Sequence, residues 1–221
     1  MESPNYKSSA TQNEPIKTYL FGTNDRKLLL QAIQELKDKK TEIPLVINGE
    51  EIKTKTILKI SAPYDHQSII AQAYVANPAH VNQAINAALQ AQKKWKSTPF
   101  EDRANIFLKA ADLITGKKRE LLNAATMLGQ GKNIYQAEID CICEFADFLR
   151  FNVDFARNIF KIQPASPPGV TNTLQYRPLE GFVVAITPFN FTAIAGNLCC
   201  APALMGNTVV WKPSEQQLYS A

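Results

Sequence analysis

An α/β fold is predicted, with a helical block followed by the first βαβ unit of a parallel, Rossmann-like sheet. Residues 182–187 and 207–211 are continuous apolar runs of strand length, which is typical of strands covered on both faces. Between them lies an apolar segment rich in Ala and Gly, which predicts a helix that ends at Gly206. Strand, helix and strand within about 30 residues indicate a parallel crossover unit.

The composition is that of a globular chain that can bury a core. Of the 221 residues, 45% are hydrophobic and 20% are charged, and the net charge is +4. No apolar run reaches the roughly 18 residues that a membrane span needs, and the N-terminal stretch lacks an apolar signal core. The basic residues form short clusters on separate predicted helix faces, whereas a nucleic-acid site needs one connected patch. We therefore expect no membrane or nucleic-acid partner, and a cytoplasmic location with the mitochondrial matrix as the alternative.

The N-terminal third changes from a polar arm to a helix and then to strands. Residues 1–24 predict a mobile arm or an extended strap, and the apolar spacing over residues 25–40 predicts a helix. Short β-like runs follow over residues 43–75, and Asn48-Gly49 predicts a hairpin turn between two of them.

Two helix starts can be recognised in the helical block, which covers residues 78–160. Asn77 precedes Pro78 and predicts an N-cap with proline in the first helical turn. The sequence Thr98-Pro99-Phe100-Glu101 predicts a capping box at the start of the next helix.

The segment 133–161 predicts one helix of about eight turns. Two apolar stripes run along it, and the remaining face carries charged residues at helical spacing, among them Asp140. Glu144 is the exception, because its spacing places a carboxylate on an apolar stripe, where it would need a partner. Residues 162–180 are rich in proline and then β-like, and they predict an excursion that leaves the helical block and returns.

Polar residues gather where the two strands of the βαβ unit end. Ligands of an open parallel sheet bind beyond the carboxyl ends of its strands. Thr187 and Asn190 follow the first strand, and Lys212, Ser214 and Glu215 follow the second. The Asn190 amide can stabilise a developing oxyanion, Lys212 and Glu215 can bond sugar hydroxyls, and Ser214 can cap a following helix. In the alternative interpretation, Asn190 only caps the helix, and Lys212 and Glu215 form a solvated pair.

The cysteines predict neither a nucleophile nor a metal site. Cys141 and Cys143 fall in the long predicted helix, and Cys199 and Cys200 fall in the helix of the βαβ unit. Small buried hydrophobes are the expected role of all four. The two histidines lie far away in the sequence, so a four-ligand zinc set is not predicted.

Several motifs occur in an order that resembles one enzyme family. TPFNFTAIAGNLCCAPALMGNTVVWKPSE resembles the aldehyde dehydrogenase superfamily, in which one strand ends in Pro-aromatic-Asn-Phe and a later strand ends in a Lys-Pro-Ser-type turn. The stretches EDRANIFLKAADLI, GQGKNIYQAEID, DFLRFN and YRPLEGFV are similar to the branch that oxidises L-glutamate γ-semialdehyde to L-glutamate in proline catabolism. The resemblance runs from about Asn13 to the last residue.

The resemblance implies a chemistry and a role for each site residue. A cysteine thiolate attacks the aldehyde, a hydride passes to NAD, and a glutamate-activated water hydrolyses the thioester. A carboxylate beside the ribose disfavours the 2′-phosphate of NADP. The implied roles are an oxyanion donor for Asn190, ribose contacts for Lys212 and Glu215, cofactor contacts for Thr187 and, more weakly, Ser214, and an aldehyde-pocket role for Glu144. In the alternative, Glu144 pairs with an Arg or Lys elsewhere in the complete fold.

The resemblance also implies that the chain is the N-terminal part of a longer enzyme. Residues 1–40 would be an arm and helix, residues 41–161 part of the cofactor-binding domain, residues 162–180 the start of an oligomerisation arm, and residues 181–221 a truncated βαβ unit. The family's nucleophile, in a Gly-Gln-x-Cys segment, would lie beyond Ala221. We expect a homo-oligomer for the full-length form and no activity for this chain alone. A catalytically dead module that pairs with full-length subunits and a non-functional fragment are the alternatives.

Overall fold

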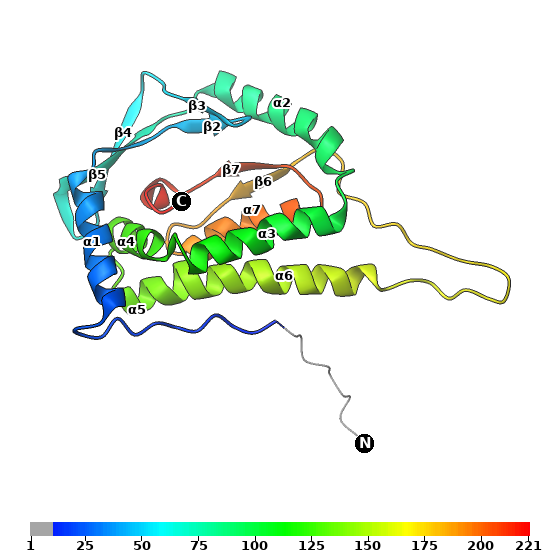
Figure 1. Ribbon diagram of the computed structural model, residues 1–221. Coiled ribbons are helices and arrows are strands. Elements are labelled where there is room, and N and C mark those ends of the chain that lie inside the picture. Colours follow the sequence, from blue (N-terminus) through cyan, green and yellow to red (C-terminus); the bar gives the residue numbers. More distant parts are fainter. Residues whose placement is uncertain (1–10) are drawn as a thin grey trace.

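The structure is a computed structural model, and it describes residues 11–221. It confirms an α/β fold in which packed helices lie beside small sheets (Figure 1). The helices are α1 (Asn24–Asp38), α2 (Pro78–Trp95), α3 (Phe100–Thr115), α4 (Arg119–Gln130), α5 (Ile134–Ala137), a π-helical segment (Glu138–Glu144), α6 (Phe145–Phe160) and α7 (Thr192–Leu204). The strands are β1 (Thr41–Ile43), β2 (Leu45–Ile47), β3 (Glu50–Ile52), β4 (Ile57–Ala62), β5 (Asp65–Tyr74), β6 (Val183–Ile186) and β7 (Val209–Lys212), and a 3₁₀ turn (Glu215–Gln217) follows β7.

An extended strap, residues 11–20, runs beneath the helices before α1 begins (Figure 1). The carboxylate of Glu14 accepts hydrogen bonds from Arg119 at 2.8 Å and from Arg150 at 2.7 Å. These charge-assisted bonds fix the strap on α4 and α6. The expected strap is therefore present over this range, and the part of the prediction that concerns residues 1–10 lies outside the described residues.

The strands form three small sheets. β5 lies between β1, which runs parallel to it, and β4, which runs antiparallel. β2 and β3 form the expected hairpin, and Asn48 and Gly49 adopt φ values of 54° and 80° in its turn. Two consecutive positive φ angles suit an Asn-Gly pair, which confirms the predicted turn.

One of the two predicted helix caps is confirmed, and the other is wrong. Asn77 caps α2 through the backbone N–H of His80, whose ring accepts from the Asn77 N–H in return. At the start of α3, however, no side chain caps the helix. The Thr98 hydroxyl donates instead to the Lys94 carbonyl, because the tight turn after α2 keeps it beside the last carbonyls of that helix.

The long helical segment is continuous from Ile134 to Phe160, but its residues 138–144 are π-helical. The wider π turn rotates the residues before it relative to those that follow. Asp140, which we expected on the outer charged face, is therefore buried with 1% exposure and bonds to the start of α7. The main apolar stripe of the segment, with Ile142, Leu149 and Val153, fills the core as predicted.

The βαβ unit is confirmed, with β6 and β7 parallel and α7 between them in the chain. The prediction that both strand faces are covered is wrong within residues 11–221. Val184 is 56% and Ile186 is 72% exposed. The face of β6 that carries these two side chains is thus open.

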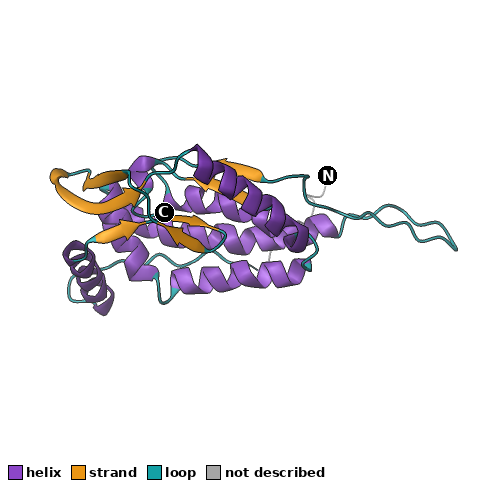
Figure 2. Ribbon diagram, turned by 90° about the horizontal axis from the view of Figure 1, so that it is seen from above, coloured by secondary structure: helices purple, strands orange, loops and turns teal. Residues whose placement is uncertain are grey.

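Residues 161–182 project from the end of α6 as an extended excursion, visible in two views (Figures 1 and 2). The predicted excursion is present, although no strand forms within residues 162–180 as their β-like pattern had suggested. The segment is held together at its base, where the Leu174 N–H donates to the Gln163 side chain at 2.8 Å.

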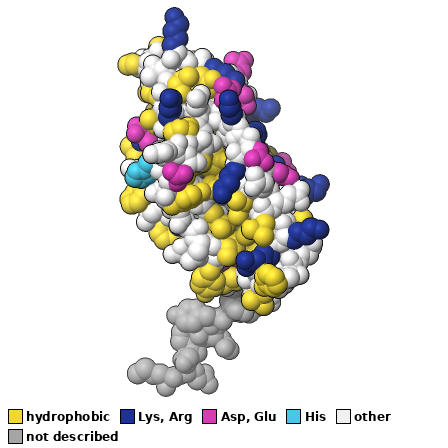
Figure 3. Space-filling view, turned by 90° about the vertical axis from the view of Figure 1, so that its left-hand side faces the viewer, with side chains coloured by type: hydrophobic (Ala, Val, Ile, Leu, Met, Phe, Trp, Pro, Cys, Tyr) yellow, Lys and Arg dark blue, Asp and Glu magenta, His cyan; other side chains and the backbone are white. Residues whose placement is uncertain are grey.

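The surface mixes charges of both signs. On the face seen in Figure 3, Lys and Arg side chains are separated by acidic and uncharged side chains and do not form one connected basic patch. Over residues 11–221, no helix combines the length and the apolar character that crossing a membrane requires.

Candidate active site

The carboxyl ends of β6 and β7 meet at one edge of the parallel sheet, as the sequence predicts. The Thr187 N–H donates to the Lys212 carbonyl at 3.3 Å, which joins the two strand ends. The Thr187 side chain is buried, and its hydroxyl accepts from the Trp211 indole at 3.0 Å. These bonds therefore hold Thr187 firmly at the edge where the two strands end.

Asn190 lies in the turn between β6 and α7 and lines a surface pocket with Phe189, Gln130, Lys132 and neighbouring residues. Its side-chain amide makes no hydrogen bond to another residue of the described chain. Phe191, not Asn190, occupies the N-cap position of α7. The interpretation of Asn190 as a mere helix cap is therefore wrong, and its amide is available to a ligand.

The cap of α7 comes instead from Asp140, which lies in the π-helical segment. Its two carboxylate oxygens accept the backbone N–H groups of Thr192 and Ala193, both at 2.9 Å. Lys132 donates to Asp140 at 2.7 Å and to the Asn190 carbonyl at 2.6 Å. These two residues thus support the turn that carries Asn190.

Sequence reasoning missed Lys132 and Asp140. A uniform α-helical period places Asp140 on the outer charged face, but residues 138–144 are π-helical and do not follow that period. A signal was nevertheless present: Phe191 is a poor N-cap residue, so a helix that starts after it needs a hydrogen-bond acceptor from elsewhere.

The residues after β7 are largely open to solvent. Lys212 and Glu215 are exposed, and no ion pair joins them in the described structure. The expected alternative of a solvated Lys212–Glu215 pair is therefore not formed. Ser214 precedes the 3₁₀ turn, but its side chain does not cap that turn. The Lys212 and Glu215 side chains thus remain free to meet a ligand, whereas the Ser214 hydroxyl donates to the Gln216 side chain at 3.5 Å.

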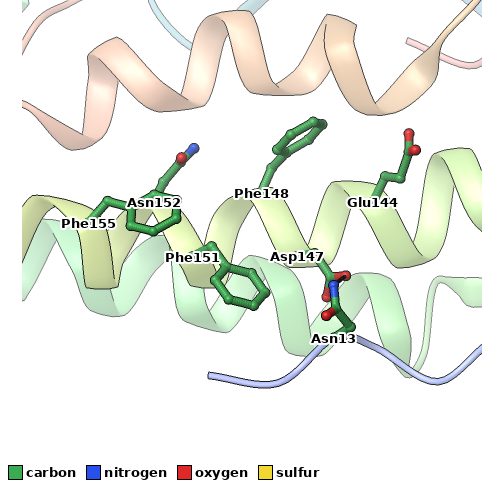
Figure 4. A pocket seen from close by; sticks show the side chains of 7 residues that line it. All are labelled: Asn13, Glu144, Asp147, Phe148, Phe151, Asn152 and Phe155. Atoms are coloured by element: carbon green, nitrogen blue, oxygen red, sulfur yellow. Dashed lines mark hydrogen bonds between the residues drawn. The ribbon is translucent and has the colours of Figure 1, made fainter. Parts of the chain in front are cut away.

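Glu144 ends the π-helical segment and lines a groove along α6 (Figure 4). In this view Glu144 and Phe148 point toward the helix drawn above them, whereas Asp147 points toward the strap residue Asn13. Glu144 is half-buried and makes no hydrogen bond or ion pair within residues 11–221. Burial raises the pKa of its carboxyl, and the nearby charges of Asp140 and Asp147 raise it further while Lys132 lowers it.

The four cysteines are held as neutral thiols. Burial raises the pKa of Cys141, Cys143 and Cys199 to about 12 and that of Cys200 to about 11. Cys141 and Cys143 are buried as expected, and Cys199 and Cys200 are half-buried in α7. Within residues 11–221, no group of three His, Cys, Asp or Glu side chains is arranged to hold a metal ion.

Comparison with known proteins identifies one family. The aldehyde dehydrogenase family model matches residues 50–221. The chain is 51% identical over 218 residues to a probable delta-1-pyrroline-5-carboxylate dehydrogenase of Schizosaccharomyces pombe, and it is 46% identical over 209 residues to the mitochondrial human enzyme of that name. The first match covers 98% of this chain and 40% of the relative. The second covers 95% of this chain and 37% of the relative. The chain thus spans about two fifths of the length of the curated relatives it matches.

Comparison with solved structures finds the same kind of relative. The Delta-pyrroline-5-carboxylate dehydrogenase of Mycobacterium tuberculosis, bound with NAD, superimposes with a TM-score of 0.94 at 46% identity. That match covers 97% of this chain and 40% of the other. A Thermus 1-pyrroline-5-carboxylate dehydrogenase with bound NAD superimposes with a TM-score of 0.86 at 31% identity, over 97% of this chain and 42% of the other.

Proposed function

Because this chain belongs to the aldehyde dehydrogenase family, we propose that it forms the N-terminal part of an enzyme that oxidises L-glutamate γ-semialdehyde to L-glutamate with NAD. The observation that carries the proposal is the unused Asn190 amide, which lies beyond the carboxyl end of β6 in a turn held by three hydrogen bonds from Lys132 and Asp140. The relatives named as pyrroline-5-carboxylate dehydrogenases, at 46–51% identity, support the substrate class.

Asn190 supplies one donor of the oxyanion site. When a cysteine thiolate attacks the aldehyde carbon, the carbonyl oxygen takes up negative charge. A preorganised amide stabilises that charge more than it stabilises the uncharged aldehyde, which lowers the barrier. The nucleophile and the glutamate that activates water for thioester hydrolysis come from outside these 221 residues.

The edge residues fit the nicotinamide dinucleotide, which supplies the hydride acceptor when bound. Lys212 and Glu215 are exposed beside the end of β7 and unpaired with each other, so both can bond ribose hydroxyls. Thr187 contacts the cofactor near the end of β6, and Ser214 is a weaker candidate in the same turn as Glu215. A carboxylate at Glu215 repels a 2′-phosphate, which favours NAD over NADP.

Glu144 selects the substrate in this proposal. Its carboxylate has no partner among the described residues and lines a groove with apolar side chains. The ammonium group of glutamate γ-semialdehyde can provide the missing positive charge. The competing role for Glu144 is an ion pair with an Arg or Lys from another part of the complete fold.

The projecting segment 162–180 supports a homo-oligomeric assembly of the full-length form. Ile162, Val170, Leu174 and Leu179 are each 49–68% exposed on it, so a partner subunit would bury apolar surface there. The same exposure, together with the open face of β6, favours the second candidate function, a catalytically inactive module that pairs with full-length subunits. A non-functional fragment is the remaining alternative.

The cytoplasm is the proposed location, with the mitochondrial matrix as the alternative. The names of the human and bovine relatives include the word mitochondrial, whereas that of the Schizosaccharomyces pombe relative does not. Cell fractionation with an antibody to this chain would decide between the two compartments.

The experiment that tests the proposed function measures NADH formation by a full-length protein that carries these residues. Glutamate γ-semialdehyde is compared with succinic semialdehyde, which has the distal carboxylate but lacks the amine. We expect kcat/KM to be at least about tenfold higher for the amine-bearing substrate, because a buried charged group left unpaired is costly. No NADH formation, or equal kcat/KM for the two aldehydes, would overturn the proposal.

A further inference from the structure

The turn that carries Asn190 lacks a local hydrogen-bond acceptor for the start of α7. Phe191 occupies the N-cap position and its side chain accepts nothing. The first N–H groups of a helix have no partner within the helix, so an acceptor must come from elsewhere in the fold. Asp140 provides it from the π-helical segment, with one carboxylate oxygen on Thr192 and the other on Ala193.

Lys132 completes the support from the other side of the turn. It follows Gly131, which ends α4 with a φ of 66° and so directs the chain toward the turn. Its ammonium group bonds both the Asn190 carbonyl and the Asp140 carboxylate, and it lies 4.5 Å from the centre of the Phe191 ring. The Lys132 and Asp140 side chains are 16% and 2% exposed, so this ion pair is little weakened by water.

Four consecutive residues, 190–193, are therefore held by two side chains. Each contact falls on a backbone group or on the Phe191 ring, and none uses the amide of Asn190. An oxyanion donor is effective only when its position is fixed before the reaction. We propose that Lys132 and Asp140 are positioning residues that fix the backbone of the turn and thereby place the Asn190 amide for catalysis. This inference rests on the proposed function.

A plain helix cap would need only Asp140. The Lys132 bond to the Asn190 carbonyl is not part of capping. Substitution of Lys132 removes this bond and leaves in place the Asp140 carboxylate that makes both cap bonds. Lys132→Met keeps the length of the side chain and removes the charge and the donors. Lys117→Met is the matched control, because Lys117 is exposed and makes no hydrogen bond or ion pair within residues 11–221.

The first measurement is a double-mutant cycle in a full-length protein that carries these residues. Lys132→Met should lower kcat by about tenfold and leave the KM values for aldehyde and NAD within about twofold. Asn190→Ala should lower kcat by about a hundredfold, and the double variant should be no slower than Asn190→Ala alone. Independent effects, which would multiply to about a thousandfold, would overturn the proposal, and so would a Lys132→Met enzyme with unchanged kcat.

The second measurement does not depend on activity. Amide hydrogen exchange of Thr192 and Ala193 should be at least about fivefold faster in Lys132→Met than in wild type or Lys117→Met. Equal exchange in all three proteins would overturn the proposal. If Lys132→Met does not fold, Lys132→Gln replaces it. A wild-type enzyme that oxidises no aldehyde would overturn the proposed function. The exchange rates would still show whether Lys132 fixes this turn.

Discussion

Asn190 differs from Asn123 and Asn207 in the hydrogen bonds that its side-chain amide makes. The Asn123 amide donates to the Glu138 carboxylate in the core, and the Asn207 amide donates to the Pro202 carbonyl. Both amides therefore stabilise the fold. The Asn190 side chain bonds no described residue, and its turn is held through backbone groups instead. An asparagine kept in place without using its amide is the arrangement that a ligand-binding donor requires.

Asn190→Ala should therefore impair catalysis without unfolding the protein. In a full-length enzyme we expect kcat to fall by about a hundredfold, the order of loss seen when one oxyanion donor is removed. Steady-state NADH formation measures the effect, and Asn82→Ala, at an exposed position on α2, is the control. Turnover at the wild-type rate would contradict the role assigned to Asn190.

Lys212 should act in cofactor binding rather than in the chemical step. Its side chain is exposed at the end of β7. Lys212→Ala should raise the KM for NAD by about tenfold and leave kcat nearly unchanged, because a contact made equally in ground and transition states affects binding alone. A large fall in kcat with an unchanged KM for NAD would instead indicate that Lys212 has a structural role.

Glu144 links stability to pH in a direction that follows from its raised pKa. Above the ordinary pKa of 4.5 the unfolded chain carries a freely hydrated Glu144 carboxylate, whereas in the folded chain burial disfavours that charge. This group therefore lowers stability as pH rises, and it contributes no penalty where it is protonated in both states.

Glu144→Gln should consequently raise the free energy of unfolding at neutral pH, and the gain should vanish below about pH 4. Urea denaturation at both pH values measures this difference. Glu50→Gln, at an exposed position on β3, is the control and should change stability at neither pH. A Glu144→Gln protein that is less stable than wild type at neutral pH would show that the carboxylate has a stabilising partner.

At the scale of elements, the contact between α6 and α7 depends on Gly196. A Cβ atom at this position would overlap the Cζ and Cε2 atoms of the Phe145 ring. The ring is packed against the main core, so it has little room to yield.

Gly196→Ala should therefore lower the free energy of unfolding by about 1–3 kcal/mol, the range expected for overpacking a filled core. Chemical denaturation followed by circular dichroism gives the value. Adding Phe145→Leu to Gly196→Ala should recover part of the loss, since the smaller side chain makes room for the methyl group. If the double variant lost the sum of the two single effects, the proposed clash would be wrong.

The elements that the sequence predicts well are those that local chemistry determines. The Asn77 cap, the Asn48-Gly49 turn and the βαβ unit each follow from a short pattern and are confirmed. The errors arise where tertiary packing decides. The π turn that brings Asp140 inward has no α-helical signature, and the Thr98 hydroxyl is drawn to α2 by a turn whose tightness the motif does not show.

The candidate site likewise has a part that the sequence predicts and a part that it does not. The strand ends place Thr187, Asn190 and Lys212 at one edge, which the pattern of apolar runs and polar ends predicts. The supports of that edge come from the loop after α4 and from the π-helical segment, 52–58 residues away in sequence. Such distant contacts leave no periodic signal, so a single sequence could not reveal Lys132.

At the scale of the whole molecule, residues 11–221 leave the open face of β6 and the projecting segment 162–180 uncovered. The exposed Val184 and Ile186 side chains are apolar and belong to a parallel sheet of two strands. Parallel sheets are usually covered on both faces. This surface therefore fits burial against further structure, which agrees with a chain that spans about 40% of its relatives.

The 221 residues alone should oxidise no aldehyde. Covalent catalysis needs a thiolate in an accessible and electropositive place, but burial raises the pKa of all four cysteines to about 11–12, so each remains a protonated thiol near neutral pH. The proposed oxyanion site has the Asn190 amide, but residues 11–221 supply no accessible thiolate to it. The purified chain, mixed with NAD and glutamate γ-semialdehyde, should therefore produce no NADH above background, while a full-length relative serves as the positive control. Steady NADH production that disappears with Cys199→Ser or Cys200→Ser would show that one of these thiols is a nucleophile after all.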